Sequence, residues 1–447
     1  MEMPEDVRES ESGRDVAEKE VKLQRARSFA IQGSPKQLSQ AVSQQLLYFS
    51  DVLPFQASYT HSLFVAFSYS ERLKINPREK PFHLHQKIPS PPSLTKLWVS
   101  GKGSPNVFFL KTHKTGSSTM QNILFRAGER RNWTVAFPRY SYQFAYPEPF
   151  SRDFVEDLPP RADRFNLLCS HTRLDVGEVQ ALMHPPTVFL TILRDPVQTF
   201  ESVFHYYQNM VPAFQSLSNH SSPLPAFLEA SSHYYNAEDI SNGLARNPMT
   251  FDLGLNPSGE EGLSSWWPRE LERLNRTFQL VMIAEHFDES LLLAQELLGL
   301  DMDELVYVRL NVRHKEEEPM AKELVEKIQA WNQADVQLYR FFQSVFWRKV
   351  EHYGYVRMKR ELAAFRALLR ETAAKCLAGE PVGPEITADE LRPWQPGSVT
   401  ILGYNLKPNL TSSQHRDCFR MVLPELQYHA YLYYRQYGRD MRPLPTV

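Results

Sequence analysis

The residues best suited to chemistry form a loop of cations and hydroxyl groups that directly follows the apolar run at residues 106–110. The loop reads Lys111, Thr112, His113, Lys114, Thr115, Gly116, Ser117, Ser118 and Thr119. Residues 120–125 continue in a pattern typical of a helix, so the loop is predicted to join a strand to a helix N-terminus. Backbone N–H groups, the positive end of the helix dipole and the hydroxyls would then converge on a phosphate or sulfate group.

The order of residues in this loop differs from that of the common nucleotide P-loop. In the pattern GxxxxGKS/T the lysine follows the second glycine and the next hydroxyl holds magnesium, whereas Lys114 precedes Gly116 here. The order from Lys114 to Ser118 resembles the 5′-phosphosulfate loop of sulfotransferases, which use 3′-phosphoadenosine-5′-phosphosulfate and need no metal. Taken alone, the pattern also fits an ordinary capped helix start.

A second candidate phosphate site follows the apolar, β-branched run at residues 187–193, which predicts a buried parallel strand. The run ends at Arg194, and Pro196 suits the first turn of the next helix. The Arg194 guanidinium and the Ser202 hydroxyl can converge on one phosphate, which in a sulfotransferase is the 3′-phosphate of the donor. In isolation, Arg194 also fits a surface ion pair with Asp195.

A candidate general base follows a third apolar run. Residues 165–169 predict a short buried strand, and His171 comes just after it. Ligands of open α/β sheets gather at the carboxyl ends of the strands, where Lys114, His171 and Arg194 would all lie. A neutral imidazole near pH 7 can accept a hydroxyl proton. Most histidines in a chain of this length have no catalytic role, so the position after the strand carries the prediction.

Six segments resemble the galactose 3-O-sulfotransferase family, and their sequences are most similar to those of the members that act on galactosylceramide. They are residues 109–126, 165–175, 192–207, 282–293, 346–354 and 391–406. The resemblance implies a P-loop-like α/β sulfotransferase fold, with a central parallel sheet flanked by helices and a helix-rich C-terminal half. It also implies transfer of a sulfuryl group from 3′-phosphoadenosine-5′-phosphosulfate to the 3-hydroxyl of a terminal β-galactose.

Under this interpretation the transfer is an in-line displacement at sulfur, which needs one base and one cation. His171 is the predicted base, and Lys114 is the predicted cation that stabilises the leaving phosphate. Lys111 and His113 are the reserve candidates for the cation, and a lysine at a strand end is usually solvated. Arg173 and Glu285 are weaker candidates for contact with the acceptor.

The acceptor and the activity leave alternatives open. Galactosylceramide or a related glycolipid is the first expectation, and N-acetyllactosamine or core-1 glycans of glycoproteins are the second. A catalytically silent homologue that binds donor or glycan is a further alternative. A P-loop kinase fits poorly, because the lysine lies on the wrong side of the glycine and only Asp195 offers an acidic metal ligand at a strand end.

The N-terminal part is predicted to differ from the rest. Residues 1–27 are dense in charge and lack a signal-peptide pattern, and residues 77–92 have the composition of a linker. The longest apolar stretch before residue 100 is at 63–67, far shorter than the roughly 20 residues of a membrane anchor. We therefore expect a disordered segment at 1–100 and a catalytic domain at 101–447. The family resemblance nevertheless implies a Golgi membrane or luminal location.

Further features fit a secreted or luminal history. Four glycosylation sequons occur at Asn132, Asn219, Asn275 and Asn409. Cys376 and Cys418 either pair as a disulfide in an oxidising compartment or remain free thiols, whereas Cys169 lies within an apolar run. No cysteine or histidine spacing predicts a metal site, and a homodimer is one option for assembly.

The composition indicates a globular enzyme. The chain has 447 residues, 42% of them hydrophobic, and a formal net charge of −2, which gives no argument for a nucleic-acid partner. Because the net charge is close to zero, donor binding must depend on local cations.

Periodic apolar residues predict helices at 289–298, 361–376 and 426–437, and helical structure across 320–353.

Overall fold

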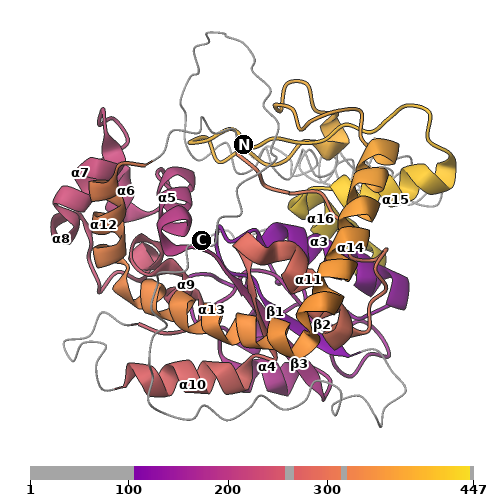
Figure 1. Cartoon of the computed structure of the whole chain (residues 1–447), viewed down its shortest axis with the longest axis horizontal. Coiled ribbons are helices and arrows are strands. Elements are labelled where there is room, and N and C mark those ends of the chain that lie inside the picture. Colours follow the sequence, from indigo (N-terminus) through magenta and orange to yellow (C-terminus); the bar gives the residue numbers. More distant parts are fainter. Residues whose placement is uncertain (1–104, 257–265, 314–319, 443–447) are drawn as a thin grey trace, which may run out of the picture. The chain divides into compact units, whose positions relative to one another are not determined.

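The three apolar runs predicted as strands, and a fourth at 280–283 that was not predicted, pair into one parallel sheet in the computed structural model (Figure 1). The structure describes residues 105–256, 266–313 and 320–442. The strand order is β2-β1-β3-β4, and every pairing is parallel. The strands are β1 (Asn106–Leu110), β2 (Leu167–Leu168), β3 (Thr187–Leu193) and β4 (Leu280–Ile283). Nearly all their residues are buried, which explains their unbroken apolar sequences. The predicted α/β class is confirmed.

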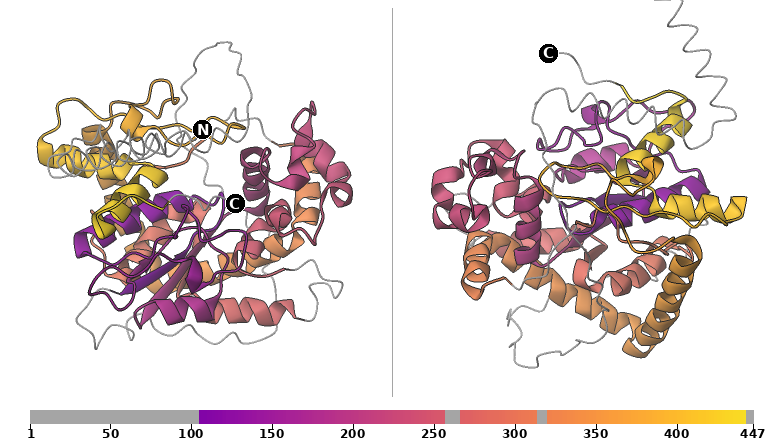
Figure 2. Two further views of the ribbon diagram at one scale, coloured as in Figure 1. Left: turned by 180° about the vertical axis from the view of Figure 1, so that it is seen from behind. Right: turned by 90° about the horizontal axis from the view of Figure 1, so that it is seen from above.

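Helices follow the strands and cover the sheet. In Figure 1 and in the view from behind (Figure 2, left), α4 and α10 lie along one side of the sheet, and α3 lies on the other. Helices α15 and α16 pack against α3. The strand-linked helices are α3 (Ser117–Arg131), α4 (Val176–Leu182), α5 (Pro196–Tyr206), α10 (Trp267–Thr277) and α11 (Phe287–Leu298). The carboxyl ends of the strands therefore lead directly into helix N-termini.

The remaining helices form the second half of the chain and a small bundle beside α5. They are α6 (Pro212–Gln215), α7 (Pro223–Glu229), α8 (Ser231–Tyr234), α9 (Pro248–Asp252), α12 (Lys322–Trp331), α13 (Gln333–Tyr353), α14 (Tyr355–Cys376), α15 (Ser412–Val422) and α16 (Glu425–Tyr437). Aromatic side chains of α5, α6 and α7 form a core of their own that fixes α5 to the bundle, and they are Phe200, Phe204, Phe214 and Phe227.

Three differences from the sequence expectation have clear causes. The helical stretch at 320–353 is two helices, because the buried Asn332 side chain accepts the backbone N–H of Asn247 (2.8 Å) at the break between them. The helix expected at 361–376 begins earlier, at Tyr355, directly after Gly354 with a positive φ of 96°. The third predicted strand shrinks to Leu167–Leu168, since the chain after it turns into the site.

The described residues also settle the state of two cysteines. Cys376 at the end of α14 and Cys418 in α15 form a disulfide with a Cα–Cα distance of 5.4 Å, and Cys169 is a buried free thiol. Within this part of the chain, no helix is long and apolar enough to cross a membrane. The predicted N-terminal segment and linker, residues 1–100, lie outside the described residues.

A buried carboxylate holds α9 in place against α13. Asp335 is fully buried, and its two oxygens accept the backbone N–H of Met249 (3.1 Å), the backbone N–H of Thr250 (2.8 Å) and the Thr250 hydroxyl (2.6 Å). Burial raises the pKa of Asp335 to about 7, while the three donors act in the opposite direction. Because the three donors are buried, losing this carboxylate would leave them without a hydrogen-bond acceptor. Asp335 therefore fixes α9, which carries Asp252 at its end.

Replacing Asp335 by alanine should destabilise the protein strongly. Leaving three buried donors unpaired should lower the free energy of unfolding by about 3 kcal/mol or more. Urea unfolding of Asp335→Ala measures this. Asp163→Ala is the matched control, because the Asp163 side chain is 85% exposed and should change stability by less than about 0.5 kcal/mol. Equal stability of the two variants would contradict the clamp.

Candidate active site

The loop between β1 and α3 is tightly folded by its own hydroxyl groups. Lys114 and Gly116 both adopt positive φ values, 59° and 82°, which reverse the chain before the helix begins. The Ser117 hydroxyl donates to the Thr112 carbonyl (2.6 Å), and the Thr112 hydroxyl donates to the Ile192 carbonyl on β3 (2.5 Å). These bonds fix the loop at the N-terminus of α3, where the Thr119 N–H donates to the Gly116 carbonyl (3.1 Å) and the earlier N–H groups face away from the helix.

Lys111 lies in the interior of the site, although a solvated lysine was expected at this strand end. Its side chain is 2% exposed, and its Nζ is 3.0 Å from Glu425 Oε2 and 2.7 Å from His171 Nε2. Glu425 also accepts a hydrogen bond from the Ser118 hydroxyl (2.8 Å). Lys111 is therefore a fixed, paired cation that joins the loop, the β2 end and α16.

The predicted base, His171, is buried and held at both ring nitrogens. Its Nδ1 lies 2.8 Å from the Lys111 carbonyl, which can only accept a hydrogen bond, so Nδ1 carries the proton. The unprotonated Nε2 then accepts a hydrogen bond from the Lys111 ammonium. Burial, followed by the neighbouring His113 and Lys111, holds the pKa of His171 well below its usual range. His171 is therefore a neutral imidazole in this arrangement.

A second histidine, His113, stacks on His171 with ring centroids 3.9 Å apart. Its Nδ1 is 3.0 Å from Asp252, and its backbone N–H donates to the same carboxylate (2.7 Å). The Tyr146 hydroxyl also donates to Asp252 (2.8 Å). A fully buried aspartate thus orients the His113 ring with its Nδ1–H toward the carboxylate, which leaves Nε2 as a proton acceptor.

Lys114 and Arg194 lie together on the other side of the loop. The Arg194 guanidinium donates to the Lys114 carbonyl (3.1 Å) and to Gln198 (3.0 Å), while the Lys114 ammonium lies 3.6 Å from the centre of the Tyr206 ring. Burial, and then the positive charges of Lys111, Arg313 and Arg194, lower the pKa of Lys114 to about 7. This concentration of positive charge favours an anionic ligand.

Arg313 and Ser202 complete this side of the site. Arg313 forms an ion pair with Glu201 on α5, and its charge acts on Lys114. Ser202 is buried on α5, as predicted, two turns beyond Arg194. Ser202 comes from the helix that follows Arg194, and a phosphate site shared by the two residues stays a prediction.

Arg173 and Glu285, the weaker acceptor candidates, are engaged in contacts within the protein. The buried Arg173 guanidinium lies 3.9 Å from the Phe251 ring centre and donates to the Phe251 and Pro147 carbonyls. Glu285 accepts the backbone N–H of Asp195 (2.8 Å) and the Tyr339 hydroxyl (3.0 Å), so it supports the start of α5.

The site contains residues that the sequence motifs did not reveal. They are Asp252, Tyr146, Glu425, Tyr206 and Arg313. Of these, Tyr206 had a sequence signal, because it lies in the segment 192–207 that resembles the family. In the described part of the chain, no group of three or more histidine, cysteine or acidic side chains is arranged to hold a metal.

The four predicted glycosylation asparagines differ in exposure. Asn132, Asn219 and Asn409 are exposed, whereas Asn275 is half-buried in α10. Asn132 also caps the C-terminal end of α3, and its side-chain oxygen accepts a hydrogen bond from Arg435 (3.1 Å). Three of the four positions can therefore present an amide to a modifying enzyme.

Comparison with known proteins identifies the family. A family profile described as Galactose-3-O-sulfotransferase matches residues 43–436. The chain belongs to the galactose-3-O-sulfotransferase family. It is 41% identical over 330 residues to the galactosylceramide sulfotransferase of Mus musculus, covering 72% of this chain and 77% of that protein. It is 40% identical over 358 residues to galactose-3-O-sulfotransferase 3 of Bos taurus, covering 76% and 82%.

The galactosylceramide sulfotransferase of Homo sapiens is similarly related, at 40% identity over 351 residues, covering 76% of this chain and 82% of that protein. The predicted family and enzyme class are confirmed, and the kinase alternative is wrong. Members named for a glycolipid and members named only for galactose are nearly equally similar to this sulfotransferase. Overall identity therefore does not separate the acceptors.

The depressed pKa of Lys114 predicts a pH dependence of donor binding. A protonated Lys114 attracts an anionic ligand, and above pH 7 the free site loses this charge, so the Kd for 3′-phosphoadenosine 5′-phosphate should rise up to about tenfold per pH unit. Isothermal titration from pH 6 to pH 9 measures this. Lys114→Arg is the control, because guanidinium stays protonated and the slope should flatten. A pH-independent Kd in both proteins would contradict the role of Lys114.

Proposed function

We propose that this sulfotransferase moves a sulfuryl group from 3′-phosphoadenosine-5′-phosphosulfate to the 3-hydroxyl of a terminal β-galactose. The observation that carries the proposal is the joining of two anion-binding elements, the loop at 111–119 and Arg194 with α5, through the Arg194 bond to the Lys114 carbonyl. A donor with phosphates at its 5′ and 3′ positions needs two such elements. The family membership supports the same donor and acceptor.

In the proposed reaction, the galactose oxygen attacks sulfur while the bond between sulfur and the phosphate oxygen breaks. The hydroxyl proton passes to an imidazole, and the departing 3′-phosphoadenosine 5′-phosphate gains one negative charge. Lys114, on the loop that faces the 5′-phosphate, would stabilise this charge. The first-turn N–H groups of α3 and the Thr119 hydroxyl would hold the phosphate in line with the acceptor. The Thr119 oxygen accepts the Leu310 N–H (3.0 Å) and so keeps its proton, whereas the Ser117 and Ser118 hydroxyls, predicted as donor contacts, donate to Thr112 and Glu425 instead.

Two imidazoles compete for the role of base. His171 was the candidate from the sequence, but its Nε2 faces the Lys111 ammonium. His113 has Nδ1 fixed by Asp252 and Nε2 turned away from that carboxylate, which is the arrangement a general base requires. The contacts therefore favour His113 as the base. His171 stacks on the His113 ring, and Lys111 holds His171 in place.

Substitution of each histidine by glutamine tests this assignment. His113→Gln should lower kcat by about 100-fold to 10,000-fold, as expected for the loss of a general base, while donor binding changes little. Asp252→Asn should lower kcat and change its pH profile, because the wrong His113 tautomer would be favoured. Single-turnover transfer of labelled sulfate measures both. A larger loss in His171→Gln than in His113→Gln would return the role to His171.

We propose galactosylceramide or a related glycolipid as the acceptor, with N-acetyllactosamine and core-1 glycans as the alternative. The family and the exposed sequons support a Golgi membrane or luminal location. Incubation of the full chain with labelled donor and these acceptors, side by side, tests the choice by the ratio of kcat/KM values. Transfer only to the glycoprotein glycans would overturn the glycolipid, and donor binding without any transfer would indicate a silent homologue.

A further inference from the structure

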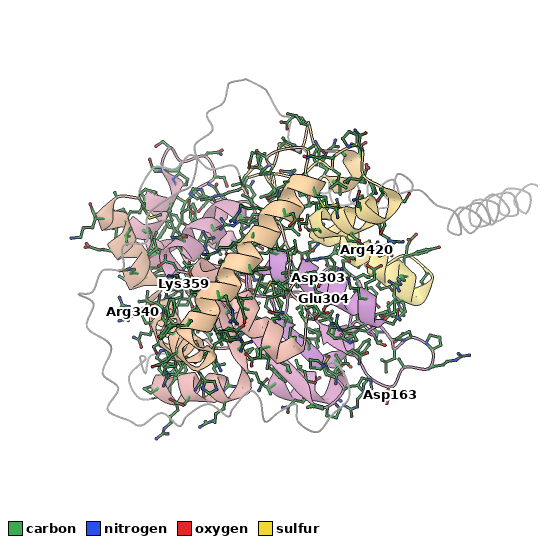
Figure 3. The ribbon with its side chains drawn as sticks, turned by 45° about the vertical axis from the view of Figure 1, so that its right-hand side comes forward. Asp163, Asp303, Glu304, Arg340, Lys359 and Arg420 are labelled. Atoms are coloured by element: carbon green, nitrogen blue, oxygen red, sulfur yellow. A yellow bond between two sulfur atoms is a disulfide. The ribbon has the colours of Figure 1, made fainter. Side chains whose placement is uncertain are left out.

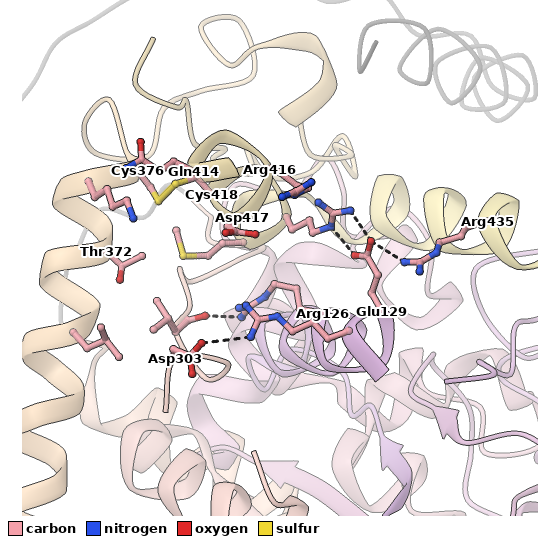
Figure 4. A pocket seen from close by; sticks show the side chains of 16 residues that line it. Arg126, Glu129, Asp303, Thr372, Cys376, Gln414, Arg416, Asp417, Cys418 and Arg435 are labelled. Atoms are coloured by element: carbon pink, nitrogen blue, oxygen red, sulfur yellow. Dashed lines mark hydrogen bonds and ion pairs between the residues drawn. A yellow bond between two sulfur atoms is a disulfide. The ribbon is translucent and has the colours of Figure 1, made fainter. Parts of the chain in front are cut away.

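A pocket outside the candidate active site lies near the C-terminal end of α3, away from the loop at 111–119. It has a volume of about 530 Å³ and is walled by the C-terminal turns of α3, the end of α14, α15 and residues 303–306 (Figure 4). Arg126, the first α3 residue of the lining, follows Ser117 by nine residues, so roughly 14 Å of helix separates this pocket from the loop. The Cys376–Cys418 disulfide fixes the wall formed by α14 and α15.

The lining of this pocket carries more positive than negative charge. Its cations are Arg126, Arg130, Lys375, Arg416, Arg420 and Arg435, and its acids are Glu129, Asp303 and Asp417. Glu129 pairs with Arg435 (2.9 Å), as Figure 4 shows, and also with Arg420 (2.6 Å). Asp303 pairs with Arg130 (3.5 Å). Among the described residues, no carboxylate lies within ion-pair distance of Arg126, Lys375 or Arg416. Asp417 is exposed and cannot balance all three.

Arg126 is the notable member of this set because its side chain is buried, with 8% of the residue exposed. Its Nε donates to the Asn122 side chain (3.0 Å) and its Nη2 donates to the Val306 carbonyl (2.5 Å), and both acceptors are neutral. Its Nη1 has no hydrogen-bond partner in the described part of the chain, while the residue lines the pocket. The charges of Glu304 and Asp303 act on Arg126 from a distance, but no carboxylate in the described residues forms an ion pair with it. Burying a cation without such contact is costly, and an anion in the pocket would offset that cost.

We propose that this pocket binds a sulfate or phosphate monoester, held between Arg126 at its floor and Lys375 and Arg416 at its rim. A planar guanidinium offers the fork of donors that matches a tetrahedral oxyanion, and a lysine adds a mobile point charge. The volume exceeds that of one such group, so the ester can be carried on a sugar or a lipid head group. The site is separate from the donor loop and does not depend on the proposed reaction.

Crystal soaking locates the anion directly. Tungstate, a heavy tetrahedral oxyanion, should give anomalous density within hydrogen-bond distance of Arg126 Nη1 and the Arg416 guanidinium. Density at the loop of residues 114–118 alone would overturn the proposal, whatever its implication for the donor.

Titration calorimetry with galactose 6-sulfate, which the proposed reaction neither uses nor makes, tests the ester in solution while saturating 3′-phosphoadenosine 5′-phosphate occupies the donor site. The double variant Lys375→Gln/Arg416→Gln should weaken binding by roughly tenfold or more for each positive charge removed. Both side chains are exposed, so the variant should fold normally. Unchanged affinity in this variant, or no binding by the unmodified chain, would refute the site.

Lys359→Gln/Arg370→Gln is the matched control, because both residues are exposed on α14 and do not line the pocket. Figure 3 shows Lys359 on the part of α14 away from Arg420 and Asp303. The control should bind as the unmodified chain does, and an equal loss would assign the effect to overall charge. Inorganic sulfate should compete more weakly than the sugar ester, and an equal or higher affinity for inorganic sulfate would overturn the monoester.

Discussion

The buried ion pair between Lys111 and Glu425 is the interaction on which the site depends most. A lysine ammonium removed from water requires a nearby carboxylate, and Glu425 at the start of α16 provides it at 3.0 Å. The same carboxylate accepts from Ser118, so α16 is joined to both ends of the anion-binding loop. The His171 ring then packs against the pair, and the His113 ring stacks on His171. The position of the candidate base is thus a consequence of how one buried charge is compensated.

A second buried carboxylate acts in the same way from another direction. Asp252 is held by α9, and α9 is held by Asp335 of α13, so the orientation of His113 traces back to the helical second half of the chain. Lys114, Arg194 and Arg313 lie close together on the other side of the anion-binding loop. Burial, followed by the positive charges of Lys111, Arg313 and Arg194, lowers the pKa of Lys114, so Lys114 holds its proton weakly before an anion arrives.

Local patterns in the sequence were sufficient to predict three of the four strands, the loop after β1 and the starts of α3 and α5, but not β4 or the start of α14. Strands buried on both faces need continuous apolar runs, and a helix start needs specific residue types such as Pro196. The positions of Lys114, His171 and Arg194 at adjacent strand ends followed from the geometry of parallel sheets. The break at Asn332 escaped prediction because its cause is a contact with Asn247, which is distant in sequence.

Burial and charge pairing could not be predicted from the sequence, because they arise from tertiary contacts. Lys111 was expected in solvent, and its partner Glu425 lies in a segment with no chemical motif. Tyr146 and Arg313 were missed for the same reason.

The contact between Ser118 and Glu425 spans 307 residues, which has a consequence for the order of synthesis. A ribosome adding roughly 5 to 20 residues per second completes the loop about 15 to 60 seconds before Glu425 exists. During that interval Lys111 has no counter-charge from α16, so the nascent loop cannot adopt its buried state. The enzyme therefore remains incapable of assembling its centre until almost the entire polypeptide has been made, and loss of the last helix would leave every other part of the centre present but unassembled.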